Sequence, residues 1–216
     1  KSNINYLKKK NIPIKKLIYL PNWTEINKNK FNTKSNKYND FVFGSNIGLS
    51  QDIKKVCEFF NKLSVLSKNN SFKIIGTGFA KNLINLNLSR SVIRKIEIYD
   101  SLKPNIYDLQ VKKSSYGIVS LDDRIESVNF PGRMLNYMKL GLPIILLTNK
   151  VNELSRFIIK NKIGVVIGKK TNIPKKLKEL NKIKKNFISN NYNEKIILKY
   201  FNVNNITKKI IKNFEE

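Results

Sequence analysis

Short, unbroken apolar runs alternate with amphipathic segments along most of the chain. Such runs suit strands that are buried on both faces of a parallel sheet. Between them, apolar residues recur at a spacing of three and four, which is typical of helices packed on one side. We therefore expect an α/β fold, a mostly parallel sheet with helices on both faces, in which ligands bind beyond the carboxyl ends of the strands. The expected strands are residues 41–43, 72–75, 96–99, 116–121, 144–147 and 164–167.

Start and stop signals place helices between these strands. Ser50 is the expected N-cap of the first helix, and Pro104 opens a later one. The other expected helices are residues 80–88, 131–140, 152–160, 173–179 and 181–189, followed by two helices within 193–214. The inner faces of these last two helices are expected to carry Ile196, Ile197, Tyr200, Phe201, Ile206, Ile210 and Ile211.

The first 40 residues differ in composition from the rest. Residues 17–20 predict a short strand that runs into a turn at Pro21, and residues 28–40 are rich in Asn and Lys, as flexible linkers are. The chain begins at Lys1 without Met, so we expect a fragment. Its first residues lack the apolar region of a signal peptide, and no apolar run approaches the 18 residues of a membrane span.

The chain is strongly basic, with 42 Lys and Arg against 15 Asp and Glu and a formal net charge of +27. Only five of the basic residues are arginine, whereas proteins that read nucleic acid rely on arginine and on interleaved aromatic side chains. The lysines are scattered and are densest at residues 175–185. This composition favours a solvated lysine surface over nucleic-acid binding, with attraction to anionic lipid headgroups as the functional alternative.

Histidine is absent and cysteine occurs once. The chain therefore cannot form a Ser–His or Cys–His nucleophilic pair, and it lacks a common zinc ligand. Cys57 lies among apolar residues of an expected helix, so we predict a buried thiol, no disulfide within the chain and a reducing compartment. Asp122, Asp123 and Glu126 are metal ligands by type, but a loop of solvated carboxylates is the simpler interpretation.

Two turns that contain glycine follow expected strands. Residues 44–48 read G-S-N-I-G and lead into a helix, an arrangement in which backbone amides are able to face an anion. Residues 76–78 read G-T-G, but the third glycine and the downstream carboxylate of a dinucleotide fingerprint are missing. We expect this second turn only to pack a helix on a strand.

One stretch, residues 127–143, organises the chain. Pro131 and Gly132 stand where a loop enters a helix, and Gly141 with Pro143 ends that helix. The unpaired N–H groups at a helix start attract anions, and Gly132 with Arg133 beside it suits a phosphate. Most helices with these end signals bind nothing, so the local pattern alone leaves both interpretations open.

The stretch resembles the signature of the family 4 glycosyltransferases of the GT-B fold, which closes around a nucleotide-sugar donor. The acidic residue that binds the ribose in the family falls at Asn136, and the first Glu of its E-x7-E pair falls at Val128. Residues 44–51 resemble the G-N-I-G-x-x-Q opening loop of polysaccharide-assembly members, with Asn46 and Gln51 where many relatives carry Arg and Lys. The residues that fit the signature are Ser127, Pro131, Arg133, Tyr137, Met138, Gly141, Pro143 and Ile144, with Arg for the usual Lys.

The resemblance implies two parts: residues 1–40 end an N-terminal domain and form a linker, and residues 41–216 are the donor-binding C-terminal half of a Rossmann-like GT-B fold. It implies that Arg133 and the amides of its helix start stabilise the leaving diphosphate, which makes Arg133 the catalytic candidate. Asn136 is expected to hold the ribose, and Tyr99 to Ser101 the edge of the base. The other candidates for substrate binding are Ser45, Asn46, Gly48, Gln51, Ser127, Val128, Asn129, Phe130 and Gly132.

The implied reaction is transfer, with retention, of a sugar from a nucleotide diphosphate donor, expected to be UDP-linked, to a sugar or lipid-linked acceptor in cell-surface polysaccharide assembly. No metal cofactor is expected, and the implied location is the cytoplasm or the inner face of the cell membrane. One alternative is a non-hydrolysing nucleotide-sugar 2-epimerase, which the missing histidine disfavours. A basic binding module without catalysis and a degenerate transferase, suggested by Asn46, Gln51, Val128 and Asn136, also stay open.

Overall fold

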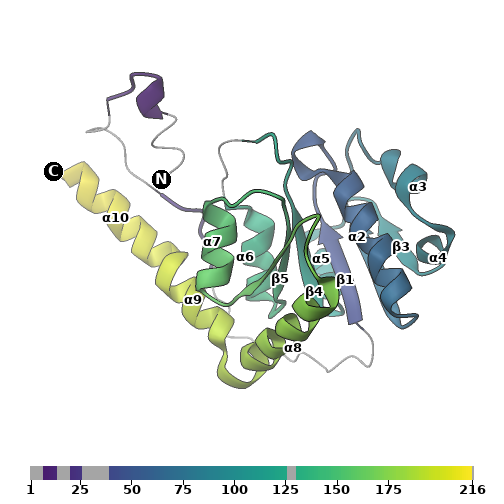
Figure 1. The fold of residues 1–216 in the computed structure, drawn as a ribbon. Helices are drawn as coiled ribbons and strands as arrows, with labels where there is room; N and C mark the ends of the chain where they lie inside the picture. The colour runs from purple at the N-terminus through teal and green to yellow at the C-terminus, as the bar shows by residue number, and fades with distance from the viewer. Residues whose placement is uncertain (1–6, 14–19, 26–38, 126–129, 216) are drawn as a thin grey trace.

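A single parallel sheet forms the centre of the molecule (Figure 1). The structure, a computed structural model, describes residues 7–13, 20–25, 39–125 and 130–215. The strand order is β3-β2-β1-β4-β5-β6, and each neighbouring pair is parallel. This doubly wound order confirms the expected fold class. The strands are β1 (Asn39–Gly44), β2 (Asn70–Ile75), β3 (Ile96–Tyr99), β4 (Tyr116–Ser120), β5 (Ile144–Leu147) and β6 (Gly164–Ile167).

Helices connect the strands and cover both faces of the sheet, as right-handed crossovers require. In Figure 1, α2 and α8 lie in front of the sheet, and α5 and α6 lie behind it. The helices are η2 (Leu49–Gln51), a short 3-10 turn, and α2 (Ile53–Leu66), α3 (Leu83–Asn87), α4 (Arg90–Ile93), α5 (Pro104–Lys112), α6 (Gly132–Lys139), α7 (Glu153–Lys160), α8 (Ile173–Asn190), α9 (Tyr192–Tyr200) and α10 (Val203–Glu215).

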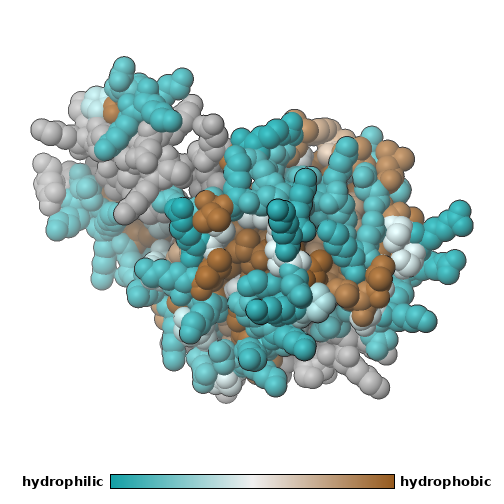
Figure 2. All heavy atoms as spheres, in the orientation of Figure 1, coloured by the Kyte–Doolittle hydropathy of each residue, from teal (hydrophilic) through white to brown (hydrophobic). Residues whose placement is uncertain are grey.

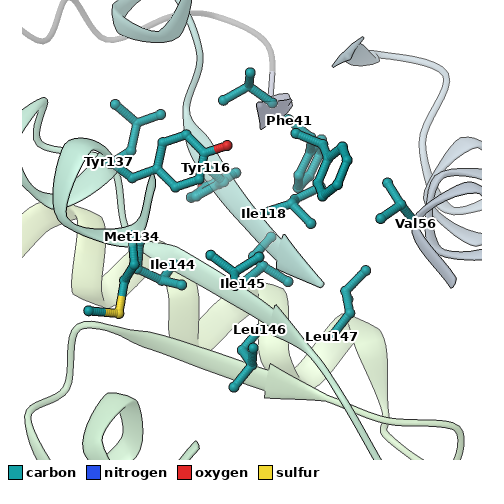
Figure 3. Packing of buried hydrophobic residues seen from close by; sticks show 14 of the residues in the cluster. Phe41, Val56, Tyr116, Ile118, Met134, Tyr137, Ile144, Ile145, Leu146 and Leu147 are labelled. Atoms are coloured by element: carbon teal, nitrogen blue, oxygen red, sulfur yellow. The ribbon is translucent and has the colours of Figure 1, made fainter. Parts of the chain in front are cut away.

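The core begins with aromatic rings at the centre of the sheet. Phe41 of β1 stacks on Phe72 of β2 with ring centroids 6.1 Å apart, and it meets Tyr116 of β4 at 5.3 Å. Figure 3 shows how the core continues, with Met134 of α6 close to Ile144 of β5. All four residues of β5 are buried, as their unbroken apolar run predicts.

Several helices differ from the expected ones. The helix expected at residues 80–88 is shorter, Leu83–Asn87, and α4 was not predicted. Asp52 rather than Ser50 is the N-cap of α2, because the Asp52 carboxylate accepts the Lys55 N–H while Ser50 lies in the preceding 3-10 turn. The two helices expected in residues 173–189 are a single helix, α8, whose buried residues Leu180, Ile183 and Phe187 form one continuous face.

The C-terminal helices bury only part of their apolar face. Ile196, Ile197, Phe201 and Ile206 are buried as expected, whereas Ile211 is 51% exposed. The reason is visible in Figure 1, where α10 extends away from the body of the domain. On the face shown in Figure 2, hydrophilic side chains surround smaller apolar patches. Within the described residues, none of the helices is long and apolar enough to cross a membrane.

The expected boundary near residue 40 stays a prediction. The strand expected at 17–20 and the linker expected at 28–40 lie almost wholly outside the described residues. Two of the described residues before β1 contact the C-terminal part: the Thr24 backbone N–H donates to the Phe201 carbonyl at 2.9 Å, and the Asn22 side-chain amide donates to the Phe130 carbonyl at 2.5 Å.

Candidate functional site

A cleft of about 840 Å³ opens at the carboxyl ends of β1, β2 and β4, where a parallel sheet of this order binds ligands. One part of its wall comes from the loop after β1, with Ser45 and Asn46, and another from the start of α6, with Gly132 and Arg133. The structure therefore brings together two segments that lie almost 90 residues apart in the sequence, which both carry predicted site residues.

The loops after β1 and β2 are joined by backbone hydrogen bonds. The Ser45 N–H donates to the Ile75 carbonyl at 2.9 Å, and the Ile47 N–H donates to the Thr77 carbonyl at 2.7 Å. Gly76 has a φ of +149°, and a Cβ there would lie 1.7 Å from the Ser45 carbonyl oxygen. Gly76 is thus required because two loops meet backbone to backbone, and not, as expected, because a helix packs on a strand.

Arg133 is the one positively charged side chain among the described residues that line the cleft. Its guanidinium lies over the Phe43 ring, 5.9 Å from the centroid, and burial lowers the pKa of the Arg133 side chain, although Tyr137 and Tyr107 oppose this shift. The Nη1 atom is buried and has no hydrogen-bond partner among the residues that the structure describes. A buried guanidinium with an unused donor is costly unless an anion or water pairs with it.

Two tyrosines contact Gly44, at the end of β1, where the cleft begins. The fully buried Tyr137 accepts a hydrogen bond from the Gly44 N–H at 2.7 Å, which ties α6 to the end of β1. Tyr107 of α5 lines the cleft and packs so closely that a Cβ on Gly44 would lie 2.2 Å from its hydroxyl. Sequence reasoning placed Tyr137 in a motif but assigned it no role, and no local pattern marks Tyr107.

Four predicted substrate-binding residues lie outside the lining of the cleft. Gly48 lies between Asn46 and Ser50, which both line the cleft, but is not part of the lining itself. The Asn136 amide donates to the Asp108 carboxylate at 2.9 Å, and its Oδ1 is buried without a partner among the described residues. Tyr99 donates to Glu97 at 2.5 Å. Phe130 packs against Phe157 with ring centroids 5.0 Å apart.

The other predicted residues divide into two groups. Gln51 and Ser101 line the cleft, and the Ser101 hydroxyl lies 3.2 Å from the Thr77 hydroxyl. Ser127, Val128 and Asn129 lie outside the described residues, as does Glu126. The roles predicted for all of these residues stay predictions.

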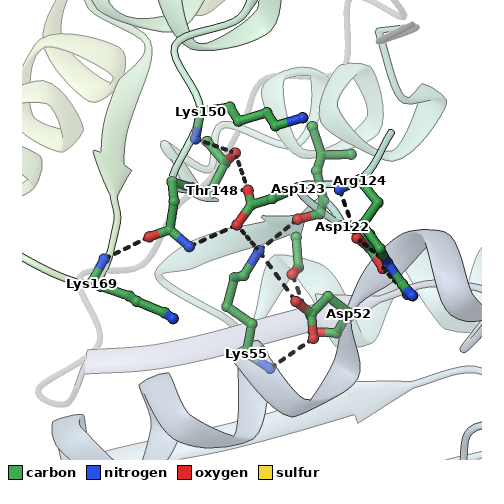
Figure 4. Close-up of polar contacts among 11 residues, drawn as sticks. Asp52, Lys55, Asp122, Asp123, Arg124, Thr148, Lys150 and Lys169 are labelled. Carbon is green, nitrogen blue, oxygen red and sulfur yellow. Dashed lines mark hydrogen bonds and ion pairs between the residues drawn. The ribbon is translucent and has the colours of Figure 1, made fainter. Parts of the chain in front are cut away.

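The two aspartates after β4 are not simply solvated, as expected, but paired. A side-chain hydrogen bond from Arg124 lowers the pKa of Asp122 to about 2. Although partial burial opposes the shift, hydrogen bonds from Asn149, Thr148 and Lys55 lower the pKa of Asp123 to about 2 (Figure 4). Across the described ranges, no group of three or more acidic or cysteine side chains is arranged to hold a metal ion.

Comparison with known proteins finds similarity in structure alone. No family model matches the sequence, and no curated protein matches it. TarM from S. aureus, solved as a G117R mutant with UDP, fondaparinux and alpha-GlcNAc-glycerol, is similar at a TM-score of 0.75 and 17% identity, over 99% of this chain and 42% of TarM. The lipopolysaccharide outer core galactosyltransferase WaaB is similar at a TM-score of 0.69 and 15% identity, over 98% of this chain and 59% of WaaB.

A separate C-terminal domain gives the most even coverage of these three. The C-terminal domain of LpcC, a glycosyl transferase group 1 family protein from Francisella tularensis, has a TM-score of 0.57 and 16% identity, over 76% of this chain and 87% of that one. The chain spans about half the length of TarM and WaaB. Its fold is that of one half of a GT-B glycosyltransferase, the C-terminal half.

Proposed function

We propose that this chain is the donor-binding half of a glycosyltransferase, which transfers a sugar from a nucleotide diphosphate to an acceptor. UDP is the nucleotide with which we would test this proposal first. The observation that carries the proposal is Arg133, which lines the cleft at the start of α6 and whose buried Nη1 has no hydrogen-bond partner within the described part of the chain. A guanidinium and a helix start both favour an anion.

The cleft would stabilise a leaving diphosphate through positive charge. As the sugar–oxygen bond breaks, negative charge grows on the diphosphate, and preorganised donors that point at it lower the barrier. Arg133 supplies the positive charge. At Gly132 an added Cβ would meet none of the described residues beyond its chain neighbours and its own helix within 4 Å, and this space lets a phosphate approach the backbone of α6. In this mechanism the charge is stabilised without a metal ion.

The finer parts of the proposal rest on what similar proteins bind. TarM was solved with UDP, and the pneumococcal O-GlcNAc transferase GtfA, with a TM-score of 0.57 and 14% identity, was solved with UDP and GlcNAc. WaaB and WaaG are described as acting on lipopolysaccharide or in its biosynthesis. We extend these properties to the present chain as a UDP-linked donor and a role in cell-surface polysaccharide assembly. Transfer with retention and a location at the inner face of the membrane rest on the resemblance of the sequence alone.

The acceptor and any base-like group belong to the other half of such a protein. The described residues of this chain offer serine, threonine, asparagine and glutamine side chains in the cleft, but the acidic ribose ligand of the family is replaced by Asn136, which is bonded to Asp108. We therefore expect donor affinity to depend chiefly on the phosphates. The pairing of Asn136 also favours a second candidate, a domain that binds the nucleotide but supports little turnover.

Calorimetric titration with UDP, GDP and ADP tests the proposal. We expect saturable binding of UDP at one site, and binding weaker by roughly 10- to 150-fold in Arg133→Met, which removes charge-assisted hydrogen bonds. Met fills a similar volume over Phe43 and leaves no buried unpaired charge. The free energy of unfolding of the Arg133→Met variant should therefore equal or exceed that of the wild type.

Arg90→Met is the matched control. It removes the same charge from an arginine that is exposed on α4 and does not line the cleft. The proposal predicts that this control keeps its nucleotide affinity within about twofold. Equal losses in both variants would mean that only general charge attraction is at work, and steep salt dependence of the binding would then point to a basic binding module.

A further inference from the structure

Behind the cleft, four loops at the carboxyl edge of the sheet are joined through one ion pair, which we call the Lys55–Asp123 node (Figure 4). The Lys55 ammonium lies 3.2 Å from the carboxylates of both Asp52 and Asp123, and it donates to the Leu121 carbonyl at 2.8 Å. Its side chain is only 17% exposed. The node therefore links the start of α2 to the loop after β4.

Asp123 also accepts hydrogen bonds from the two residues that follow β5. Its Oδ1 accepts from the Thr148 hydroxyl at 2.9 Å and from the Asn149 N–H at 3.0 Å, and its Oδ2 accepts from the Asn149 amide at 2.6 Å. Asn149 in turn accepts from the Lys169 N–H at 2.8 Å, beyond β6. The loops after β1, β4, β5 and β6 are thus held by one carboxylate and its neighbours.

The residues of the node are close in sequence to residues that line the cleft. Leu121 and Ile125, on either side of Asp123, line the cleft, as do Ser50 and Gln51 on the facing loop. The two loops also touch directly, because the Asp122 N–H donates to the Ser50 carbonyl at 3.0 Å. Asp123 itself is absent from the lining, so it reaches the cleft only through its neighbours.

We propose that Asp123 is a positioning residue, which holds the wall from Leu121 to Ile125 in the shape that receives the donor. This inference rests on the proposed function. The negative charge and the acceptor geometry both matter: Asp123 accepts four hydrogen bonds, whereas an asparagine would turn an NH₂ group toward donors on Thr148, Asn149 or Lys55. The loss would also leave a mostly buried ammonium with a weaker set of partners.

The test combines hydrogen exchange with nucleotide affinity in the 216-residue chain. In Asp123→Asn we expect amides of residues 121–125 to exchange at least tenfold faster, with β1 and β5 unchanged, and UDP to bind about tenfold more weakly. Glu179→Gln is the matched control, since it makes the corresponding change at an exposed carboxylate of α8 that pairs with Lys176 and does not line the cleft. It should leave both readouts within twofold.

A milder variant covers the case in which Asp123→Asn does not fold. Thr148→Val removes a single hydrogen bond to Asp123 with little change of shape, and it should move both readouts in the same direction by a smaller factor, about threefold. Folding of every variant is checked by far-UV circular dichroism.

The outcomes separate this inference from the function on which it rests. Unchanged exchange in a folded variant overturns the positioning role, and so does faster exchange with unchanged UDP affinity. If the wild-type chain binds none of UDP, GDP and ADP, the proposed function fails in this chain and the donor part of the inference falls with it. Faster exchange confined to 121–125 would in that case still support the role of Asp123 in holding the wall.

Discussion

Replacing Gly76 with alanine should open the junction between the two loops that form one side of the cleft. Gly76 has a φ of +149°, which side-chain-bearing residues rarely adopt, and its added Cβ would lie 1.7 Å from the Ser45 carbonyl oxygen. No real Cβ approaches an oxygen so closely, and the obstacle is backbone rather than a flexible side chain. The loop after β1 must therefore move.

The cost follows from what that movement breaks. A backbone strained in this way costs about 1–3 kcal/mol. Separating the loops also removes the Ser45 N–H···Ile75 and Ile47 N–H···Thr77 hydrogen bonds, of 2.9 and 2.7 Å, worth about 0.5–1.5 kcal/mol each. We expect Gly76→Ala to lower the free energy of unfolding by roughly 2–6 kcal/mol.

Urea unfolding followed by circular dichroism measures this loss. Gly132→Ala is the matched control, because its added Cβ meets none of the described residues outside its own helix and its chain neighbours within 4 Å. Its free energy of unfolding should change by less than about 1 kcal/mol. If Gly76→Ala were as stable as this control, the close backbone contact of the two loops would be refuted.

Three further outcomes follow from other parts of the structure. Gly132→Ala should keep its stability yet bind UDP several-fold more weakly, measured by calorimetry, if a phosphate approaches the start of α6; equal affinity would contradict that approach. Tyr137→Phe leaves the Gly44 N–H without its buried acceptor and should lower the free energy of unfolding by about 1–3 kcal/mol in urea titration, whereas an unchanged midpoint would argue against the bond. Burial raises the pKa of the Cys57 thiol to about 12, so a thiol reagent should label it only after unfolding, and rapid labelling of the native protein would contradict its burial.

The parallel sheet could be predicted because each strand has a local pattern of apolar residues in the sequence. The four apolar residues of β5 and the Pro131–Gly132 start of α6 each carry their structural reason within a few neighbours, and both are found where expected. The buried Cys57 follows in the same way from the apolar face of α2. Such local signals fix the elements and, through the rules of parallel topology, the edge at which a ligand binds.

The details of the cleft depend on contacts that sequence spacing does not reveal. Tyr137 meets Gly44 across 93 positions, and Asp123 meets Lys55 across 68. The hydrogen bond from Asn136 to Asp108 on a neighbouring helix could not be read from the sequence either, and the ribose contact predicted for Asn136 stays a prediction. Which loops approach one another is decided by the order of the strands, and only then do these residues become partners.

The most direct test of the account is a nuclear magnetic resonance titration of the isotope-labelled chain with UDP. Binding in the cleft around Arg133 predicts saturable shifts that are largest for the backbone amides of Ser45, Asn46, Gly132 and Arg133, and that are lost in Arg133→Met. Shifts spread over the lysine-rich surface of α8, or none at any UDP concentration, would contradict the claim that this cleft receives the donor.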